Sequence, residues 1–315
     1  MVSPSSFSRL GLGTVQFGQA YGINNTTGQV SFKEVCEILN LAHAYGITFL
    51  DTSRNYGNSE EVIGRAVREV EKDFTICTKL DLPANFRDLD DRSLIEEIDA
   101  SVNGSLDALG LDAVPLYLLH NFDYYTWKDH LIWQVVQERR DQGLIQKLGI
   151  SIGNGPHEAI EALDDKDVTA LQIPYNILDQ RWKQSGFFEK KNNVTVITRS
   201  AYLQGLLLMD PKKAAEKVKD AVPFLKRFHE LAESWDMSIK ELAFSYVLGS
   251  SEVDVTIVGV DALSQLRENI ELMQTPPLPD EARRVIEQEF SEVPVEVVNP
   301  SFWTRHFTQP AAVKK

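Results

Sequence analysis

The sequence predicts a single-domain (β/α)₈ TIM barrel, in which eight parallel strands form a closed cylinder inside a ring of helices. Short apolar runs, typical of buried strands, alternate with stretches of helical periodicity along the chain. The length of 315 residues suits one α/β barrel. No low-complexity tract, repeat or linker divides the sequence. We therefore expect one domain over residues 1–315, with 291–315 as a C-terminal tail on the substrate side.

Eight segments have the length and apolar character of barrel strands. They are residues 9–15, 47–51, 74–79, 115–120, 147–151, 170–173, 194–198 and 253–258. A glycine pattern in the first segment also fits another fold, because Gly11, Gly13 and Gly18 are similar to a dinucleotide-binding fingerprint. Position 16 is Gln and no helical pattern opens there, so spacing and context both exclude that alternative.

Helical patterns lie between the strand segments. The first starts at Ser31, where Ser31 and Glu34 form a capping box expected to satisfy the exposed amides of the first turn. Val35, Ile38, Leu39 and Ala42 follow at helical spacing and should face the barrel. The other helices are expected at residues 58–70, 92–109, 127–140, 156–163, 212–235, 239–248, 264–273 and 280–290.

Composition excludes several classes of function. A formal net charge of −14 argues against a nucleic acid or an anionic membrane as partner, since both require basic surface. Cys36 and Cys77 have neither CxxC nor metal-ligand spacing, so we expect reduced core thiols and no metal site. The first residues lack a signal-peptide pattern and no apolar stretch could span a bilayer, which predicts a cytoplasmic protein.

Four polar residues lie at or just past the ends of strand segments: Asp51, Tyr56, Lys79 and His120. Taken singly, each has an ordinary structural explanation, such as a turn cap, a packed aromatic or a core histidine. In a parallel barrel, however, the carboxyl ends of the strands meet at one mouth, where catalytic residues gather. The sequence therefore predicts that these four side chains form one site.

In this order the four residues resemble the catalytic tetrad of the aldo-keto reductase superfamily. The resemblance extends over roughly residues 8 to 275 through Gly11-Leu-Gly-Thr, Tyr56-Gly-x-Ser59-Glu60, Leu118-Leu-His120, Gly149-Ile-Ser151, Gln172-x-x-Tyr175-Asn176, Ser200 with Gly205-Leu-Leu, and Gly259 with Glu268-Asn269. It implies the barrel fold and reduction of an aldehyde or ketone by a nicotinamide cofactor. The opening motif is similar to that of a microbial branch often linked with carbohydrate metabolism.

The chemistry of these side chains agrees with the roles that the resemblance implies. Carbonyl reduction needs a proton donor at the oxygen where negative charge develops. An ammonium stabilises a neighbouring phenolate, so Lys79 should make Tyr56 a better general acid. Asp51 should keep the buried Lys79 charged and oriented. His120, as a neutral imidazole, can donate to the carbonyl oxygen.

Cofactor-binding residues are also expected at the strand ends. Ser151 and Gln172 suit the nicotinamide carboxamide, which offers both a donor and an acceptor. The family usually places an aromatic on the nicotinamide where this chain has Arg199, whose planar guanidinium can stack but should disfavour the oxidised ring. The resemblance implies further cofactor contacts from Gly13, Thr14, Asp51, Ser200, Leu203, Gly205, Gly259, Gln265 and Asn269.

The sequence leaves the choice between NADPH and NADH open. The helix after Gly259 is expected to begin a phosphate cradle. NADPH-using relatives often place Lys or Arg shortly after this glycine, whereas this chain has Asp261, which should repel a 2′-phosphate. Arg267 is a remaining candidate for binding that phosphate. Family habit favours NADPH and Asp261 favours NADH.

Aromatic residues in two loops are candidates for the substrate pocket. One group lies between His120 and Trp127, and the tail carries Phe302, Trp303, Arg305, His306 and Phe307. Packing of the loops onto the barrel explains them equally well. Gln16, Phe17, Gly18 and Tyr21 are expected to complete a pocket. The sequence names neither the small carbonyl substrate nor the oligomeric state, and a sensor module with negligible turnover is the alternative to an enzyme.

Overall fold

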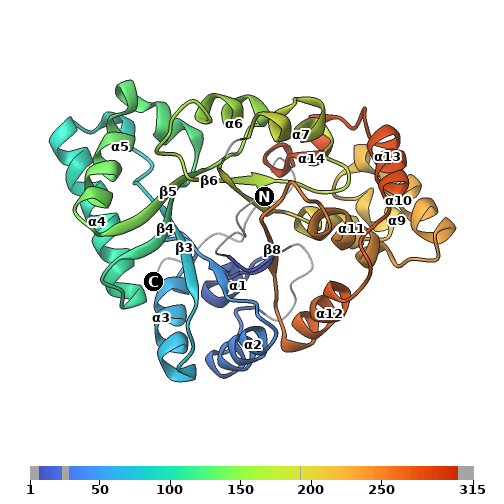
Figure 1. Cartoon of the computed structure of the whole chain (residues 1–315), viewed down its shortest axis with the longest axis horizontal. Coiled ribbons are helices and arrows are strands. Elements are labelled where there is room, and N and C mark those ends of the chain that lie inside the picture. The colour runs from blue at the N-terminus through green and yellow to red at the C-terminus, as the bar shows by residue number, and fades with distance from the viewer. Residues whose placement is uncertain (1–6, 23–27, 192, 304–315) are drawn as a thin grey trace.

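The computed structural model describes residues 7–22, 28–191 and 193–303. Its eight strands form a closed parallel barrel in the order β1 to β8, and Figure 1 shows helices surrounding them. The strands are β1 (Leu10–Gly13), β2 (Phe49–Asp51), β3 (Thr75–Leu80), β4 (Val114–Leu119), β5 (Ile145–Ser151), β6 (Ala170–Pro174), β7 (Thr195–Arg199) and β8 (Val255–Gly259). The predicted fold class and all eight predicted strands are confirmed.

The long helices lie largely where the sequence predicts them. They are α2 (Phe32–Ala44), α3 (Ser59–Val70), α4 (Asp91–Leu109), α5 (Phe122–Asp141), α6 (Pro156–Ala162), α10 (Val222–Ser234), α11 (Ile239–Leu248), α12 (Leu263–Met273) and α13 (Asp280–Glu289). Shorter helical turns join them: α1 (Val15–Gly18), η1 (Phe86–Asp88), α7 (Arg181–Gln184), α8 (Phe187–Lys190), η2 (Leu203–Leu208), α9 (Pro211–Ala214), η3 (Lys219–Ala221), α14 (Val295–Val298) and η4 (Pro300–Phe302).

Two helix predictions need correction. The segment predicted as one helix over 212–235 is α9, η3 and α10. Pro223 explains the break, since proline lacks the N–H that a continuous helix needs and fits the first turn of α10. Helix α5 begins at Phe122, ahead of the predicted 127, and residues 127–130 interrupt it with non-helical backbone. Asn121 caps this early start through its side chain, which accepts from the Tyr124 amide.

The predicted capping box at the start of α2 forms only in part. The Ser31 hydroxyl accepts from the Glu34 amide, with 3.3 Å between the two atoms. The Glu34 carboxylate, however, accepts from the Leu263 amide at the start of α12, at 3.1 Å. Helices α2 and α12 lie side by side in Figure 1 and are in contact. A pattern that predicts a local cap therefore serves a contact between distant helices.

The core has an inner and an outer part. Alternate strand residues fill the barrel: Phe49, Cys77, Leu116, Leu118, Ala170, Ile197, Val255 and Ile257 form one buried cluster. Intervening residues pack outward against the helices in two larger clusters. Cys77 is buried and Cys36 is half-buried, and both are free thiols. No helix in the described parts of the chain is long and apolar enough to cross a membrane.

The described part of the predicted tail packs on the outside of α7, where Gln184 donates to the Ser291 carbonyl at 2.8 Å. Trp303 is buried and donates to the Glu296 carbonyl at 3.0 Å, whereas Phe302 is exposed. Arg305, His306 and Phe307 lie outside the described residues.

Candidate active site

The alternation that fills the barrel also places the polar site at its mouth. Side chains two residues apart on a strand point to the same side of the sheet. On five strands, the apolar side chain inside the barrel is followed two residues later by a polar one at the mouth. Phe49 is followed in this way by Asp51, Cys77 by Lys79, and Leu118 by His120. Ala170 and Ile197 are followed by Gln172 and Arg199. Residues far apart in sequence therefore form one polar layer above an apolar plug.

Lys79 and Asp51 form a buried ion pair in this layer. The Lys79 ammonium lies 2.7 Å from Asp51 Oδ1, and it also donates to the Thr52 carbonyl at 2.9 Å. Both residues are less than 5% exposed. Burial alone would lower the pKa of Lys79, but attraction to Asp51, with smaller contributions from Tyr56 and Cys77, raises it overall. Lys79 is thus held as an ammonium.

Tyr56 and His120 lie next to this pair. The ammonium of Lys79 is 5.2 Å from the centroid of the Tyr56 ring, and the Tyr56 and His120 rings meet edge to face at 6.1 Å. Burial, followed by the charges of Lys79 and Arg199, lowers the pKa of His120 to about 3. His120 is therefore neutral near pH 7. Its Nδ1 lies 3.2 Å from the Ser53 hydroxyl, which leaves Nε2 for another partner.

A large cavity of about 850 Å³ opens over these residues. Asp51, Tyr56 and His120 line one end. Lys79 is buried behind them and does not line the cavity. Of the predicted cofactor residues, Gly13, Thr14, Ser151, Gln172, Arg199, Ser200, Gly205, Gly259, Gln265 and Asn269 line the cavity. Leu203 does not line it and is fully buried in the outer core.

Gln172 is oriented by Asp51 of the buried ion pair. Its Nε2 donates to Asp51 Oδ1 at 2.7 Å, whereas its Oε1 has no hydrogen-bond partner among the described residues. A buried acceptor without a partner is costly unless a ligand or water satisfies it. Gln172 lines the cavity, and this free acceptor fits a ligand group that donates a hydrogen bond, such as the amide of a nicotinamide.

Arg199 contributes a positive charge to the same end of the cavity. One guanidinium nitrogen donates to the Ile152 carbonyl at 3.0 Å. Among the described residues no carboxylate forms a salt bridge with it. Arg199 belongs to the same polar layer as His120, and its charge contributes to the lowered pKa of His120.

Glu60 ties together the segments that carry Tyr56 and Lys79. Its buried carboxylate accepts from the hydroxyl of Thr78, the neighbour of Lys79, at 2.6 Å. It also accepts from Ser105 of α4 at 2.8 Å and pairs with Arg54 of the Tyr56 loop at 3.0 Å. The Tyr56-Gly-x-Ser59-Glu60 motif thus has a physical reason, since its glutamate fixes the loop against strand β3.

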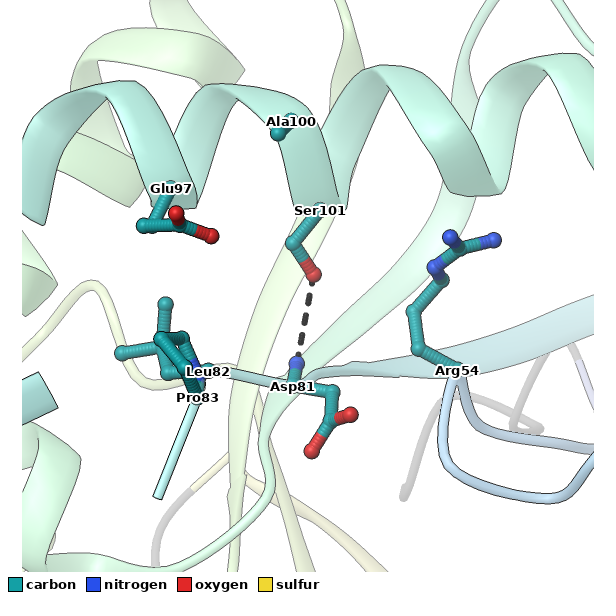
Figure 2. Close-up of a pocket in the computed structure, with 7 residues that line it drawn as sticks. All are labelled: Arg54, Asp81, Leu82, Pro83, Glu97, Ala100 and Ser101. Atoms are coloured by element: carbon teal, nitrogen blue, oxygen red, sulfur yellow. Dashed lines mark hydrogen bonds between the residues drawn. The ribbon is translucent and has the colours of Figure 1, made fainter. Parts of the chain in front are cut away.

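A smaller cavity of about 280 Å³ shares Arg54 with this network (Figure 2). Arg54, Asp81, Glu97 and Ser101 contribute its polar wall, and the Ser101 hydroxyl accepts from the Asp81 amide at 3.2 Å. Burial raises the pKa of Asp81, which Arg54 partly opposes. None of the four residues Asp51, Tyr56, Lys79 and His120 lines this cavity, so it is separate from the candidate active site.

Two glycines fix the backbone beside Tyr56. A Cβ on Gly57 would lie 2.3 Å from the Gly18 carbonyl oxygen, and one on Gly18 would lie 1.8 Å from the Tyr56 carbonyl oxygen. Gly57 also has a φ of +60°, which side chains other than glycine rarely adopt. The loop that carries Tyr56 therefore packs directly, backbone against backbone, on α1.

The far end of the cavity includes residues that the sequence analysis missed. Lys240 of α11, Tyr202 and Gln204 are in its wall, and Asn55, the neighbour of Tyr56, is a further lining residue that was missed. Helix α11 is predicted well, but no sequence pattern shows that its first turn meets the end of β8. Gln16 and Tyr21 line the cavity as predicted, whereas Phe17 is in the core and Gly18 is not in the wall. Arg267 is exposed and is not in the wall either.

The aromatic residues after His120 pack the loop and do not form a pocket wall. Phe122, Tyr124 and Tyr125 are all less than 10% exposed and belong to the outer core. Phe86 contacts Tyr124 and Trp127 edge to face at 5.1 and 5.4 Å. None of them lines the large cavity. Of the two explanations that the sequence left open, packing is therefore the one that the structure supports.

Comparison with known proteins agrees with this geometry. The model of the Aldo/keto reductase family matches residues 9–288. The aldo-keto reductase YhdN of Bacillus subtilis is 27% identical over 294 residues, which cover 82% of this chain and 83% of YhdN. The NADH-specific methylglyoxal reductase of Escherichia coli is 25% identical, with 84% of this chain and 89% of the reductase covered.

A similar fold is found in the aldo-keto reductase AKR11C1 from Bacillus halodurans in its holo form. The TM-score is 0.72 at 24% identity, over 93% of this chain and 95% of that one. The family match covers most of the chain, and the barrel fold agrees with it. The chain belongs to the aldo/keto reductase family of oxidoreductases.

Proposed function

We propose that this protein reduces an aldehyde or ketone, with sugar-derived carbonyls among the candidates, to an alcohol, with Tyr56 as the general acid and NAD(P)H as the cofactor. The observation that carries the proposal is the buried Lys79–Asp51 pair at 2.7 Å beside the Tyr56 ring. A buried ion pair adds little to folding stability, so its position at the mouth of a large cavity has a better explanation in catalysis.

Each of the four residues has a separate proposed role. Tyr56 gives its phenolic proton to the carbonyl oxygen as charge develops there, and the Lys79 ammonium stabilises the phenolate that remains. Asp51 keeps Lys79 charged and in place. Neutral His120 donates to the carbonyl oxygen and orients it. The reduced nicotinamide supplies the hydride when it is bound.

The cofactor is proposed to lie along the large cavity. The Gln172 Oε1 atom and the Ser151 hydroxyl would hold the carboxamide, and the Arg199 guanidinium would stack on the nicotinamide ring. Gly13, Thr14, Ser200 and Gly205 would follow the central part of the dinucleotide, and Gly259, Gln265 and Asn269 its adenosine half. Leu203, which is buried away from the cavity, is no longer part of this proposal. Family habit favours NADPH, while the E. coli relative is named as NADH-specific.

Turnover tests this proposal directly. Oxidation of NADH and NADPH would be followed by absorbance with a panel of small aldehydes, methylglyoxal and open-chain sugars. We expect transfer of deuterium from a cofactor labelled at the nicotinamide C4 position to the product carbon. Tight cofactor binding without turnover on any carbonyl would instead support the alternative, a regulatory module that senses the cofactor.

A further inference from the structure

The large cavity has a second end whose charge bears on which cofactor it accepts. If the proposed function holds, the nicotinamide ring lies by Tyr56 and His120, so the adenosine half extends along the cavity. The opposite wall is formed by the segment after β8 and by α12, and it contains Asp261, Gln265, Glu268 and Asn269. NADPH differs from NADH there by one phosphate in place of a ribose hydroxyl.

The start of α12 is already occupied by a carboxylate. Helix N-termini attract anions because their first amides have no partner within the helix. Ala262 is the N-cap of α12 and has no side chain that could satisfy them. Glu34 of α2 supplies the acceptor, since its Oε1 accepts from the Leu263 amide at 3.1 Å. The positive end of α12 is thereby partly neutralised from outside the helix.

The neighbouring cavity wall adds another acceptor. Asp261 lines the cavity, and its backbone N–H donates to the Gln265 side chain at 2.8 Å, which fixes the turn. The Asp261 carboxyl group interacts with the side chains of Gln265 and Gln16, but its Oδ1 atom has no hydrogen-bond partner among the described residues. A carboxylate oxygen in this position can accept from a hydroxyl, whereas it repels a phosphate.

The lysine in this wall does not offset these acids. Lys240 forms an ion pair with Glu268, so its charge is matched within the wall itself. Among the described residues, no other lysine or arginine lines the part of the cavity formed by β8 and α12. The balance of charge at this end is therefore negative.

We propose that Glu34 and Asp261 together select NADH over NADPH. Glu34 holds the α12 amide that a 2′-phosphate would otherwise use, and Asp261 accepts from the 2′-hydroxyl that only NADH presents. This selection runs against the general habit of the family. It also gives Glu34, which does not line the cavity, a positioning role exerted through α12.

Dissociation constants for the two reduced cofactors test this selection, measured by quenching of tryptophan fluorescence and by calorimetry. Wild-type protein should bind NADH at least about tenfold more tightly than NADPH. Glu34→Gln keeps an acceptor for the Leu263 amide but removes the charge. It should strengthen NADPH binding by about three- to tenfold, the range for one charge near the surface, and change NADH binding by less than about twofold.

Two further variants examine Asp261. Asp261→Asn should weaken NADH and strengthen NADPH binding. Asp261→Arg should shift the preference towards NADPH by about thirtyfold or more, because one charge-assisted contact is gained and one hydrogen bond is lost. Both shifts should become smaller between 50 mM and 500 mM salt, as expected for partly exposed charges.

Glu37→Gln is the matched control for Glu34→Gln. Glu37 lies on the same helix and pairs with Lys33 at 3.6 Å in solvent, so its replacement should leave both constants unchanged. If the wild type binds NADPH as tightly as NADH or more tightly, this inference is wrong while the proposed function stands. The same holds if the ratio of the NADPH and NADH dissociation constants is unchanged in both Glu34→Gln and Asp261→Asn. Failure to bind either cofactor would overturn the proposed function and this inference with it.

Discussion

The two ends of the large cavity differ in how their charges are matched. At the end proposed to be catalytic, which we call the catalytic end, Lys79 and Asp51 pair with each other and Gln172 bonds to Asp51, so the ionised groups are held by side chains from other strands of the barrel. At the far end, Asp261 keeps a free oxygen, and Glu34 and Lys240 reach the region from two separate helices. The first arrangement is rigid and shared by the whole tetrad. The second can be changed one side chain at a time.

This difference predicts where substitutions act together. Within the catalytic end, loss of one member should disable the others. At the far end, substitutions should change cofactor affinity separately and leave the chemical step intact.

Removal of either member of the buried pair should have the largest effect. Lys79→Met leaves the Asp51 carboxylate buried without its cation, which should lower the free energy of unfolding by about 3–5 kcal/mol. Turnover should fall by at least about a hundredfold in Lys79→Met and in Asp51→Asn alike. The double variant should be no slower than the slower single variant, since linked groups are not additive. Urea unfolding and single-turnover rates measure both quantities.

Lys183→Met is the control for this pair, because Lys183 also has carboxylate partners, Glu252 and Glu287, but lies on the outside of the barrel. It should cost about 1 kcal/mol or less and leave turnover unchanged. Additive losses in log turnover at Asp51 and Lys79 would show that the two residues act independently.

Tyr56→Phe isolates the proton donor. The ring and its contact with Lys79 remain, so folding and cofactor affinity should change little, with dissociation constants within a few fold of the wild type. Turnover should fall by at least about a hundredfold, the lower range for general acid catalysis. Tyr45→Phe, at an exposed tyrosine of the outer surface, should have no effect. A Tyr56→Phe variant with most of its activity on a good aldehyde would exclude Tyr56 as the acid.

His120 should make stability depend on pH. Its pKa is lowered from 6.5 to about 3 in the folded protein, so the unfolded chain binds the proton more readily. Its share of stability is complete above pH 6.5 and is lost as the pH falls from 6.5 towards 3. At pH 5 the loss is about 2 kcal/mol.

The measurement is the free energy of unfolding at pH 8 and pH 5 for the wild type and His120→Asn. The variant should show a difference between the two pH values that is smaller by about 2 kcal/mol. Parallel pH dependence in both proteins would mean that His120 titrates normally in the folded state.

Arg199 should have the smallest effect. If its guanidinium stacks on the nicotinamide, its charge disfavours the oxidised, positively charged ring. Arg199→Met should then raise affinity for the oxidised cofactor relative to the reduced one by roughly two- to fivefold. Arg199→Lys keeps the positive charge but removes the planar guanidinium, and it should retain the wild-type ratio of affinities for the oxidised and reduced cofactors. A ratio that stays constant in both variants would place the guanidinium away from the ring.

The sequence predicted the catalytic end much better than the far end, for a physical reason. Asp51, Lys79, His120, Gln172 and Arg199 are placed by strand periodicity, which sequence shows directly. Their meeting then follows from closure of the barrel. Glu34 and Lys240 depend instead on how helices pack against each other, and the same Ser31-to-Glu34 spacing that indicates a local cap is compatible with a contact to α12.

The interrupted start of α5 was missed for a related reason. The segment from Phe122 to Tyr125 has no clear helical period of its own, and Asn121 and the core contacts of its aromatic side chains fix it. Tertiary packing therefore decides its structure, and propensity alone does not.

The direct contact between Gly18 and Gly57 has a consequence for protein engineering. A library that randomises the mouth of the barrel in search of new substrates would naturally include positions beside Tyr56. At these two positions nearly every variant would force the two backbones apart and displace the phenol, so inactive clones would reveal nothing about specificity. Diversity is better placed at Tyr21, which lines the cavity and is not part of this backbone contact.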